Sequence, residues 1–485
     1  MATIIEQKPL FTTLPVGQDV IFTVSNNLIV ANQTNVKFVA EVHISSLLQP
    51  NLSTTTDVVG TFKTTPNNAG VGMFDFRPII ENYVKSDNLS TKDSEYKRTL
   101  GSESKLYPLH LIDKFSRNTN IIKYLAIKFQ VEYLDTEQYL PDGVTANPTF
   151  NQIVTVEPEN SDIYKIFNGY LKYDDVLTLG TNTAANDFGY SVAGFDMITG
   201  GTNFLTNAPT TQYANVDDYG VLAILASQGN TSIGDFRSIK FTYYDSSGSQ
   251  IGSPDQIDRD GGNGAYKFYT GKIPNEILYV GAYPGNLRNY ASQFAILISG
   301  GNTPAYYTVE ALWNNGSLTG SSNVYTIYVN CPTLKGYEPI RLCWLNQWGA
   351  WDYYTFTMKS TRMISTQGST YNQLEGTWNE AAYKIHGFKG GKKAFRVNAA
   401  EKISINTDYV NESESEWFEE LINSPEVYML KKFEKTVYTT SALNQYVTPV
   451  RLITSSYTRK TVANDKLMQY TFEIEKSKTL RTQSI

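Results

Sequence analysis

The sequence predicts an all-β protein, a multi-domain β-sandwich architecture with a few short helices. Three observations predict this class. Apolar and polar residues alternate along many segments, as in a strand with one buried face. Clusters of Gly, Asn, Ser and Pro separate these segments and are typical of turns. Tyr outnumbers Phe, 34 against 23, which suits strands whose rings pack on one side and meet water on the other.

The alternation predicts individual strands. It is clearest in four segments, 37–44, 125–133, 325–331 and 468–475. In the first, His43 falls beside Glu41 on the polar face, opposite Val42 and Ile44. Turns are expected at the polar clusters between such segments, namely 66–70, 246–249, 314–317 and 387–391. Within the third cluster, Asn315-Gly316 is a favourable two-residue hairpin turn.

Helices are expected to be few and short. One is predicted from Pro78 to Val84, with proline near its first position, where the missing N–H costs little. Another is predicted at about 413–423, a short amphipathic helix in which Ser413 and Glu416 would form a capping box. Pro425 would end it.

The length of 485 residues suggests several domains. Changes in composition divide the chain into three. Residues 1–160 would be an N-terminal β domain, and residues 161–335 a Gly/Asn/Ser-rich β domain that is a candidate insertion. Residues 336–485 would be a C-terminal β domain with the short amphipathic helix.

Charge and hydropathy exclude some classes of function. The net charge is −6, so the basic excess typical of nucleic-acid binding is missing, and no direct contact with nucleic acid is expected. No apolar run reaches the length of a membrane span, and the N-terminus lacks the pattern of a signal peptide. We therefore expect synthesis in the cytoplasm and no membrane insertion. Cys331 and Cys343 are too few for a disulfide scaffold and are expected to be structural thiols.

No catalytic or metal-binding motif emerges. His43, His110 and His386 lie outside any metal-binding pattern and are expected to be structural. The segment 258–269 faintly resembles a calcium loop, but it lacks the glycine at position six and the closing glutamate, so it is interpreted as a polar turn. The segment 386–393 lacks the spacing of a phosphate loop and is interpreted as a basic hairpin turn. The sequence predicts a protein that is not an enzyme and has no cofactor or metal.

An aromatic cluster between residues 344 and 356 is the densest feature of the chain. Its rings could form a platform that stacks on sugars, or they could fill a core. The core interpretation is favoured, because Trp344 continues the apolar alternation of Ile340 and Leu342. The candidates for a glycan-binding or interface role are Trp348, Trp351 and Tyr353.

Three stretches resemble virion structural proteins of tailed bacteriophages, of the tail or baseplate type found in phages of Bacteroidetes-like hosts. The first runs from Ile4–Pro9 through Val20–Val24 and Gly72–Phe76 to Tyr83. The second is Leu342–Tyr353, whose segment Asn346-Gln347-Trp348-Gly349-Ala350-Trp351-Asp352-Tyr353 is similar to an Asn-x-x-Gly-aromatic-Asp-aromatic turn in those proteins. The third begins at Glu416–Tyr428 and continues to Arg481.

The resemblance implies a structural subunit in the virion tail: a distal tail, collar or adaptor component. Such a subunit would assemble with copies of itself into a ring and support neighbouring tail or receptor-binding proteins in host attachment. The middle domain would be an adaptor or receptor-facing module. The alternatives are a carbohydrate-binding adhesin that binds a host surface glycan through the aromatic cluster, a head-associated decoration protein or a fibre protein. A tail glycan hydrolase is a further alternative, and it would need a pair of carboxylates in a groove.

Overall fold

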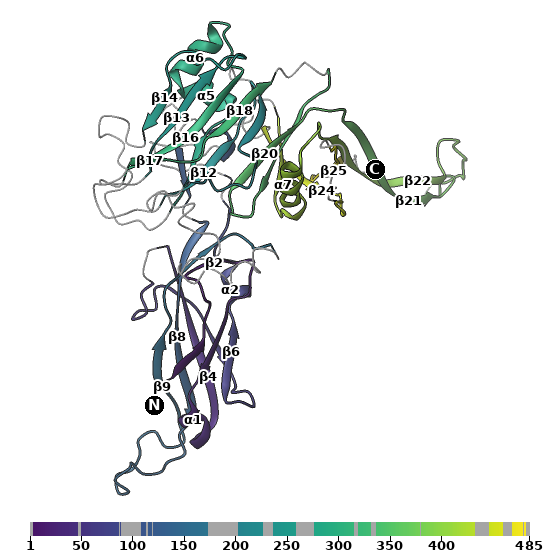
Figure 1. The fold of residues 1–485 in the computed structure, drawn as a ribbon. Coiled ribbons are helices and arrows are strands. Elements are labelled where there is room, and N and C mark those ends of the chain that lie inside the picture. Colours follow the sequence, from purple (N-terminus) through teal and green to yellow (C-terminus); the bar gives the residue numbers. More distant parts are fainter. Residues whose placement is uncertain are drawn as a thin grey trace. The chain divides into compact units, whose positions relative to one another are not determined.

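The computed structural model confirms the all-β class, with several sheets and few helices (Figure 1). It divides into two compact units. Unit 1 comprises Met1–Thr211, Tyr219–Tyr328 and Asn346–Trp351, and unit 2 comprises Gln212–Asp218, Val329–Leu345 and Asp352–Ile485. The structure describes residues 3–46, 50–86, 88, 108–112, 115–118, 120–172, 202–226, 236–258, 276–314, 319–330, 336–378, 380–431, 446–458, 468–478 and 480–481.

The N-terminal part of unit 1 is a β-sandwich. Its strands are β1 (Ile4–Gln7), β2 (Thr13–Pro15), β3 (Ile21–Ser25), β4 (Thr34–Ser45), β5 (Val58–Thr64), β6 (Val71–Asp75), β8 (Ile122–Leu134), β9 (Ile153–Asn160) and β10 (Tyr164–Phe167). One sheet has the order β1-β3-β6, and the other has the order β2-β10-β8-β4-β5, with β9 also paired to β8. The alternation in 37–44 and 125–133 is thus part of β4 and β8, which pair with each other.

One apolar core joins the two sheets of this sandwich. Phe22 and Phe74 come from the first sheet, and Phe129 comes from the second. The ring centroid of Phe129 lies 5.6 Å from that of Phe22 and 5.8 Å from that of Phe74. Aromatic rings at this separation add to the stabilisation from their buried area. Packing between the two apolar faces therefore accounts for the sandwich.

The rest of unit 1 contains two further sheets and a pair of helices. The strands of this part are β7 (Phe115–Asn118), β12 (Val221–Ala226), β13 (Phe236–Tyr244), β14 (Asp255–Asp258), β15 (Glu276–Gly281), β16 (Tyr306–Asn314), β17 (Thr319–Ser321) and β18 (Tyr325–Asn330). In one sheet β15 lies between β12 and β7, and in the other the order includes β18-β16-β13-β14, with β17 paired to β16. The predicted turn at Asn315-Gly316 lies outside the described residues.

Two buried polar side chains connect the helices α5 (Pro284–Tyr290) and α6 (Ser292–Ser299) to this part of unit 1. The carboxylate of Asp255 accepts hydrogen bonds from the backbone N–H groups of Gln293 and Phe294 in the first turn of α6. The amide of Asn286 donates to the carbonyl oxygens of His110 and Ile112. These bonds satisfy polar groups that are buried, which would otherwise cost stability.

Unit 2 is built on one large antiparallel sheet. Its strands are β19 (Ile340–Leu345), β20 (Trp351–Phe356), β21 (Thr361–Gln373), β22 (Gly391–Asn406), β23 (Val427–Leu430), β24 (Val447–Leu452), β25 (Thr471–Lys476) and β26 (Leu480–Arg481). Their order is β20-β19-β23-β24-β25-β22-β21, and β26 pairs with β22. The short strand β11 (Thr211–Asn215) contributes most of its residues to unit 2.

The helix α7 (Glu412–Asn423) packs on this sheet near β19, at the place where the sequence predicts a helix. Its N-cap is Asn411, whose side chain accepts from the N–H of Glu414. Glu414 in turn accepts from the N–H of Asn411, which completes a capping box. The predicted box between Ser413 and Glu416 is therefore wrong. An Asn two residues earlier is an equally good N-cap, and it allows the helix to begin sooner.

The other helices are short, as expected. The proline-started helix is α2 (Arg77–Ile80), shorter than the predicted segment, and α1 (Asn27–Asn32) and the 3₁₀ turn η2 (Leu109–Leu111) occur in unit 1. The sequence patterns do not predict α1, α5 or α6. Among the described residues, no helix has the length and apolar character needed to cross a membrane.

Candidate functional site

The three candidate aromatic residues are all buried. In unit 1, Trp348 is 5% exposed and its indole N–H donates to Asn207 Oδ1 at 3.2 Å. Also in unit 1, the ring of Trp351 meets the ring of His110 edge-on at 5.3 Å. In unit 2, the ring of Tyr353 lies 5.2 Å from the guanidinium carbon of Arg341. Stacking on a sugar needs an exposed ring face, so the burial favours the packing interpretation. Glycan binding by these residues stays a prediction.

The rest of the cluster belongs to the core of unit 2. Trp344 is fully buried, and its ring centroid lies 4.8 Å from that of Trp417 on α7. The indole N–H of Trp417 donates to Asp352 Oδ2 at 2.7 Å. Tyr354 packs edge-on against Phe418. The aromatic residues of β19 and β20 therefore attach α7 to the sheet.

The histidines occupy three different environments. His43 is fully buried, and its Nε2 lies 2.7 Å from Glu41 Oε1. His43 and Glu41 therefore share a face of the strand, as the alternation predicts, but that face is covered along the second half of β4. His110 is also buried, as a structural histidine is expected to be. His386 stacks on Phe388.

The described cysteine, Cys343, is a buried thiol on β19, and Cys331 lies outside the described residues. Burial raises the pKa of the Cys343 thiol. The thiolate is the reactive form, so a buried thiol with a raised pKa reacts slowly.

In a Cys331→Ser variant, the remaining thiol is therefore expected to react with Ellman's reagent on the order of a hundredfold more slowly in buffer than in urea. Spectrophotometry of the coloured thiolate that the reagent releases measures both rates. Equal rates in buffer and in urea would contradict the burial of this side chain.

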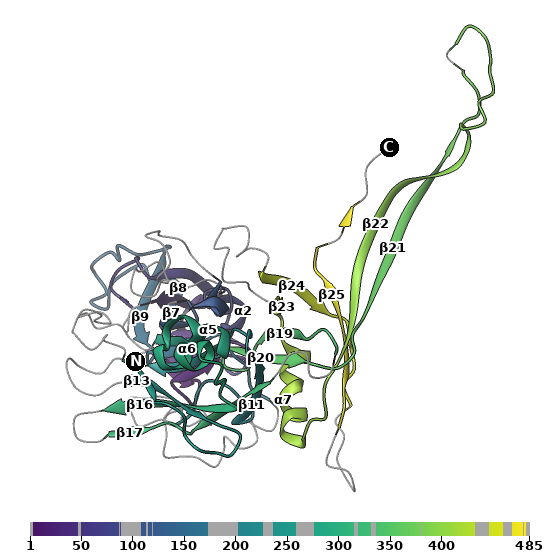
Figure 2. The same ribbon diagram turned by 90° about the horizontal axis from the view of Figure 1, so that it is seen from above.

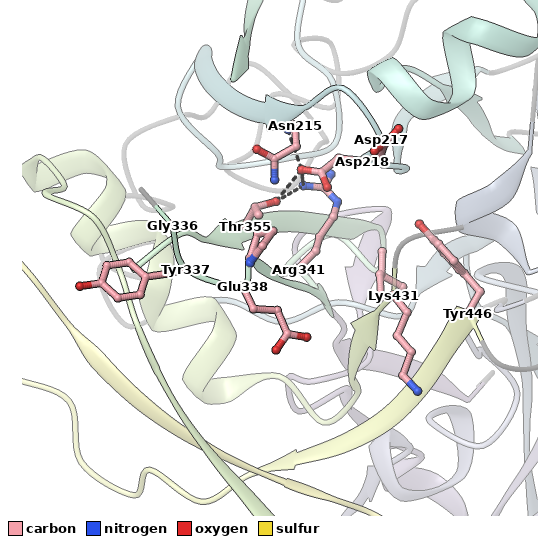
Figure 3. Close-up of a pocket in the computed structure, with 12 residues that line it drawn as sticks. Asn215, Asp217, Asp218, Gly336, Tyr337, Glu338, Arg341, Thr355, Lys431 and Tyr446 are labelled. Atoms are coloured by element: carbon pink, nitrogen blue, oxygen red, sulfur yellow. Dashed lines mark hydrogen bonds and ion pairs between the residues drawn. The ribbon is translucent and has the colours of Figure 1, made fainter. Parts of the chain in front are cut away.

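A pocket of about 410 Å³ lies within unit 2 (Figure 3). Its wall includes a polar network around the carboxylate of Asp218. Asp218 Oδ2 accepts hydrogen bonds from the backbone N–H of Asn215 at 2.8 Å and from Thr355 Oγ1 at 2.8 Å. Arg341 Nη1 lies 3.4 Å from the same oxygen and 2.8 Å from Thr355 Oγ1. Figure 3 shows these groups converging, with Glu338 and Lys431 also on the pocket wall.

The network of Asp218, Arg341 and Thr355 is suited to stabilising the fold of unit 2. The buried guanidinium neutralises the carboxylate and connects the 215–218 turn to β19 and β20. Glu338 forms an ion pair with Arg362, whose Nη2 donates to both carboxylate oxygens, at 2.9 and 3.0 Å. Sequence reasoning missed the pair of Asp218 and Arg341, since 123 positions separate them and no local pattern connects them.

Replacing Arg341 with methionine is expected to lower the free energy of unfolding of unit 2 by about 2 kcal/mol, because a largely buried carboxylate loses its charged partner. Urea denaturation measures the change. The matched control is Arg362→Met, which removes a half-exposed guanidinium from its ion pairs with Glu338 and Glu401 and should cost about 0.5 kcal/mol or less. Equal losses of unfolding free energy for the two substitutions would show that burial does not strengthen the pair of Arg341 and Asp218.

An exposed β-hairpin is the second distinctive feature of unit 2. Beyond the pairing of β22 with β25 and β26, the strands β21 and β22 continue together away from the other strands of their sheet (Figure 2). We call residues 364–397 the arm, and residues 374–390 its tip. Among the described residues, each strand of the arm pairs only with the other. Two-stranded ribbons are marginally stable in water unless another surface covers them.

The tip exposes large apolar side chains. Trp378 is 68% exposed and Phe388 is 74% exposed. The other large apolar residues exposed in the tip are Leu374, Tyr383 and Ile385. The tip has internal structure nevertheless, because Lys393 Nζ donates to the carbonyl oxygen of Phe388 and the N–H of Gly390 donates to Gln373. The segment 386–393, interpreted as a basic hairpin turn, is thus where the tip leads into β22.

The described residues contain no group of three or more His, Cys, Asp or Glu side chains placed to hold a metal ion. The calcium-like segment lies outside the described residues from Arg259 onward.

Comparisons with known proteins do not identify a family. No protein-family model and no curated protein matches the chain. Among solved structures, one similarity is to the native conformation of E. coli alpha-2-macroglobulin, with 10% identity and a TM-score of 0.13. It covers 84% of this chain, which spans 39% of that one. At this TM-score the similarity carries no argument about fold or function.

Proposed function

We propose that this chain is a non-enzymatic structural subunit of a bacteriophage virion, a component of the tail or baseplate that assembles with copies of itself. The middle β domain would be an adaptor or receptor-facing module. The observation that carries the proposal is the arm, a two-stranded ribbon with an apolar tip. A group of exposed large apolar side chains commonly marks an interaction surface. The resemblance of both ends of the chain to tail proteins supports the choice of assembly.

The described surface supports assembly better than ligand chemistry. In the pocket of unit 2, Arg341 and Asp218 are paired with each other, which suits a structural role for this pair. The three candidate sugar-stacking aromatics are buried. The arm, by contrast, presents backbone and side chains that a neighbouring chain could cover.

Immunogold electron microscopy tests the proposal. An antibody raised against the purified chain is applied to gradient-purified phage particles, with pre-immune serum as the control. The expected result is gold at the tail end of the particle. Labelling confined to material other than virions would contradict the proposal, and labelling confined to the head would contradict the tail position.

A further inference from the structure

We propose that the arm of one copy binds the body of a second copy of this chain, meaning the residues outside the arm, which carry a net negative charge. This inference deepens the proposed function and rests on it, because it names the segment through which the subunits would assemble. The arm carries five basic and two acidic side chains, a net charge of +3. The remainder of the chain has 36 basic and 45 acidic side chains, a net charge of −9.

The basic side chains are concentrated at the tip and just beyond it. They are Lys384, Lys389, Lys392, Lys393 and Arg396. Lys392 and Arg396 are exposed on β22, next to the apolar tip. A positive segment is attracted to the negative remainder of another copy and repelled by another arm. The charge therefore favours binding of an arm to the body of a neighbour over binding of two arms to each other.

The apolar tip supplies the second half of the contact. Trp378 and Tyr383 lie side by side, with ring centroids 5.1 Å apart. The indole N–H of Trp378 donates to the carbonyl oxygen of Glu375, so its polar atom is satisfied within the tip. Covering these rings on another chain removes apolar area from water without leaving that N–H unpaired. Exposed aromatic residues of this kind commonly dominate the energy of an interface.

An arm on one copy and the net-negative body of the next form a heterologous contact. Such a contact uses two different surfaces of the same chain, so each copy can bind a neighbour on both sides. Repeated from copy to copy, it closes a ring when the rotation between copies returns to the first one, and otherwise it forms an open filament. The arm is also protected by this contact, because β21 is the terminal strand of its sheet and presents an open edge.

Sedimentation velocity of the purified full chain tests the inference through its self-association. The wild type is expected to form oligomers that dissociate at high salt, where exposed charges are screened. Lys392→Glu with Arg396→Glu should weaken association by about tenfold or more. The matched control is Lys359→Glu with Lys478→Glu, which changes the net charge equally at exposed sites outside the arm and should have little effect. Circular dichroism checks that all variants keep their strand content.

The apolar half of the contact is tested in the same way. Trp378→Ala with Phe388→Ala should weaken association by about 30-fold. The control is Tyr139→Ala with Phe150→Ala, a pair of exposed aromatics in unit 1 that should leave association unchanged.

Cross-linking identifies the surfaces. Unlabelled and ¹⁵N-labelled copies are mixed and treated with a carbodiimide, which joins lysines to carboxylates in contact. The expected products join arm lysines of one isotopic form to acidic residues outside the arm in the other. Cross-links confined to one copy, or joining arm to arm, would overturn the inference, as would a chain that stays monomeric. Flotation of a monomeric chain with phosphatidylserine vesicles would also overturn it, in favour of a lipid surface. These measurements use the purified chain and test the contact made by the arm, whereas the immunogold experiment tests the position in the virion. Either result can therefore be negative without the other.

Discussion

Replacing Trp417 with alanine is expected to lower the free energy of unfolding of unit 2 by about 4 kcal/mol. The indole ring is 3% exposed and packs against Trp344 and Tyr354, with centroids at 4.8 and 6.2 Å. Alanine would leave a cavity in the layer that attaches α7 to the sheet. It would also remove the donor to the buried carboxylate of Asp352. Both effects act in the same direction.

Trp417→Phe separates the two effects, because it keeps most of the ring and removes the N–H. It should cost about 2 kcal/mol. The matched control is Trp378→Ala in the tip, which removes an exposed tryptophan from the same unit and should cost about 0.5 kcal/mol or less. Urea denaturation gives the overall change, and hydrogen exchange of the α7 peptide gives the local one. Similar losses of unfolding free energy for Trp417→Ala and Trp378→Ala would contradict the placement of Trp417 in the core of unit 2.

The second large effect is expected in the N-terminal sandwich. Phe129→Ala should destabilise it by about 4 kcal/mol, because this fully buried ring contacts rings of the opposite sheet. Removing it leaves a cavity between the two sheets. Hydrogen exchange of peptides from β4 and β8 measures the free energy of opening in this part of unit 1.

Phe129→Leu should cost about 1.5 kcal/mol, since leucine refills part of the space. Phe150→Ala, at a position that is 46% exposed, is the control and should cost about 0.5 kcal/mol or less. If Phe150→Ala lowered the stability as much as Phe129→Ala, the burial of Phe129 between the two sheets would not explain its contribution.

The strands of the core can be predicted because their signal is local. A sandwich buries one face of each strand more than the other, so residues two apart share an environment. This is why the strands at 37–44 and 125–133 are recognisable from the alternation of residue types alone. His43 departs from the pattern, because the second half of β4 is covered on both faces. The start of α7 is harder to predict, since Asn411 and Ser413 are both good N-caps and only the folded chain decides between them.

The arm and the pocket cannot be predicted in the same way. Residues 365–373 are a nearly continuous polar run, Ser-Thr-Gln-Gly-Ser-Thr-Tyr-Asn-Gln, with no apolar face to give a period. Pairing with β22 defines that strand. The pocket joins residues from turns and strands that are distant in the chain, Asp218 with Arg341 and Thr355. The two acidic residues at 217–218 are visible in the sequence, but their partners are not.

A cryo-electron microscopy map of the intact phage particle would test the central claim most directly. The account predicts several copies of this chain arranged around the tail axis, with the arm of each copy lying on the body of its neighbour. The tip around Trp378 would be covered, and Lys392 and Arg396 would face carboxylates of the adjacent copy. A map with this chain outside the tail, or with every arm uncovered in the assembled particle, would contradict the account.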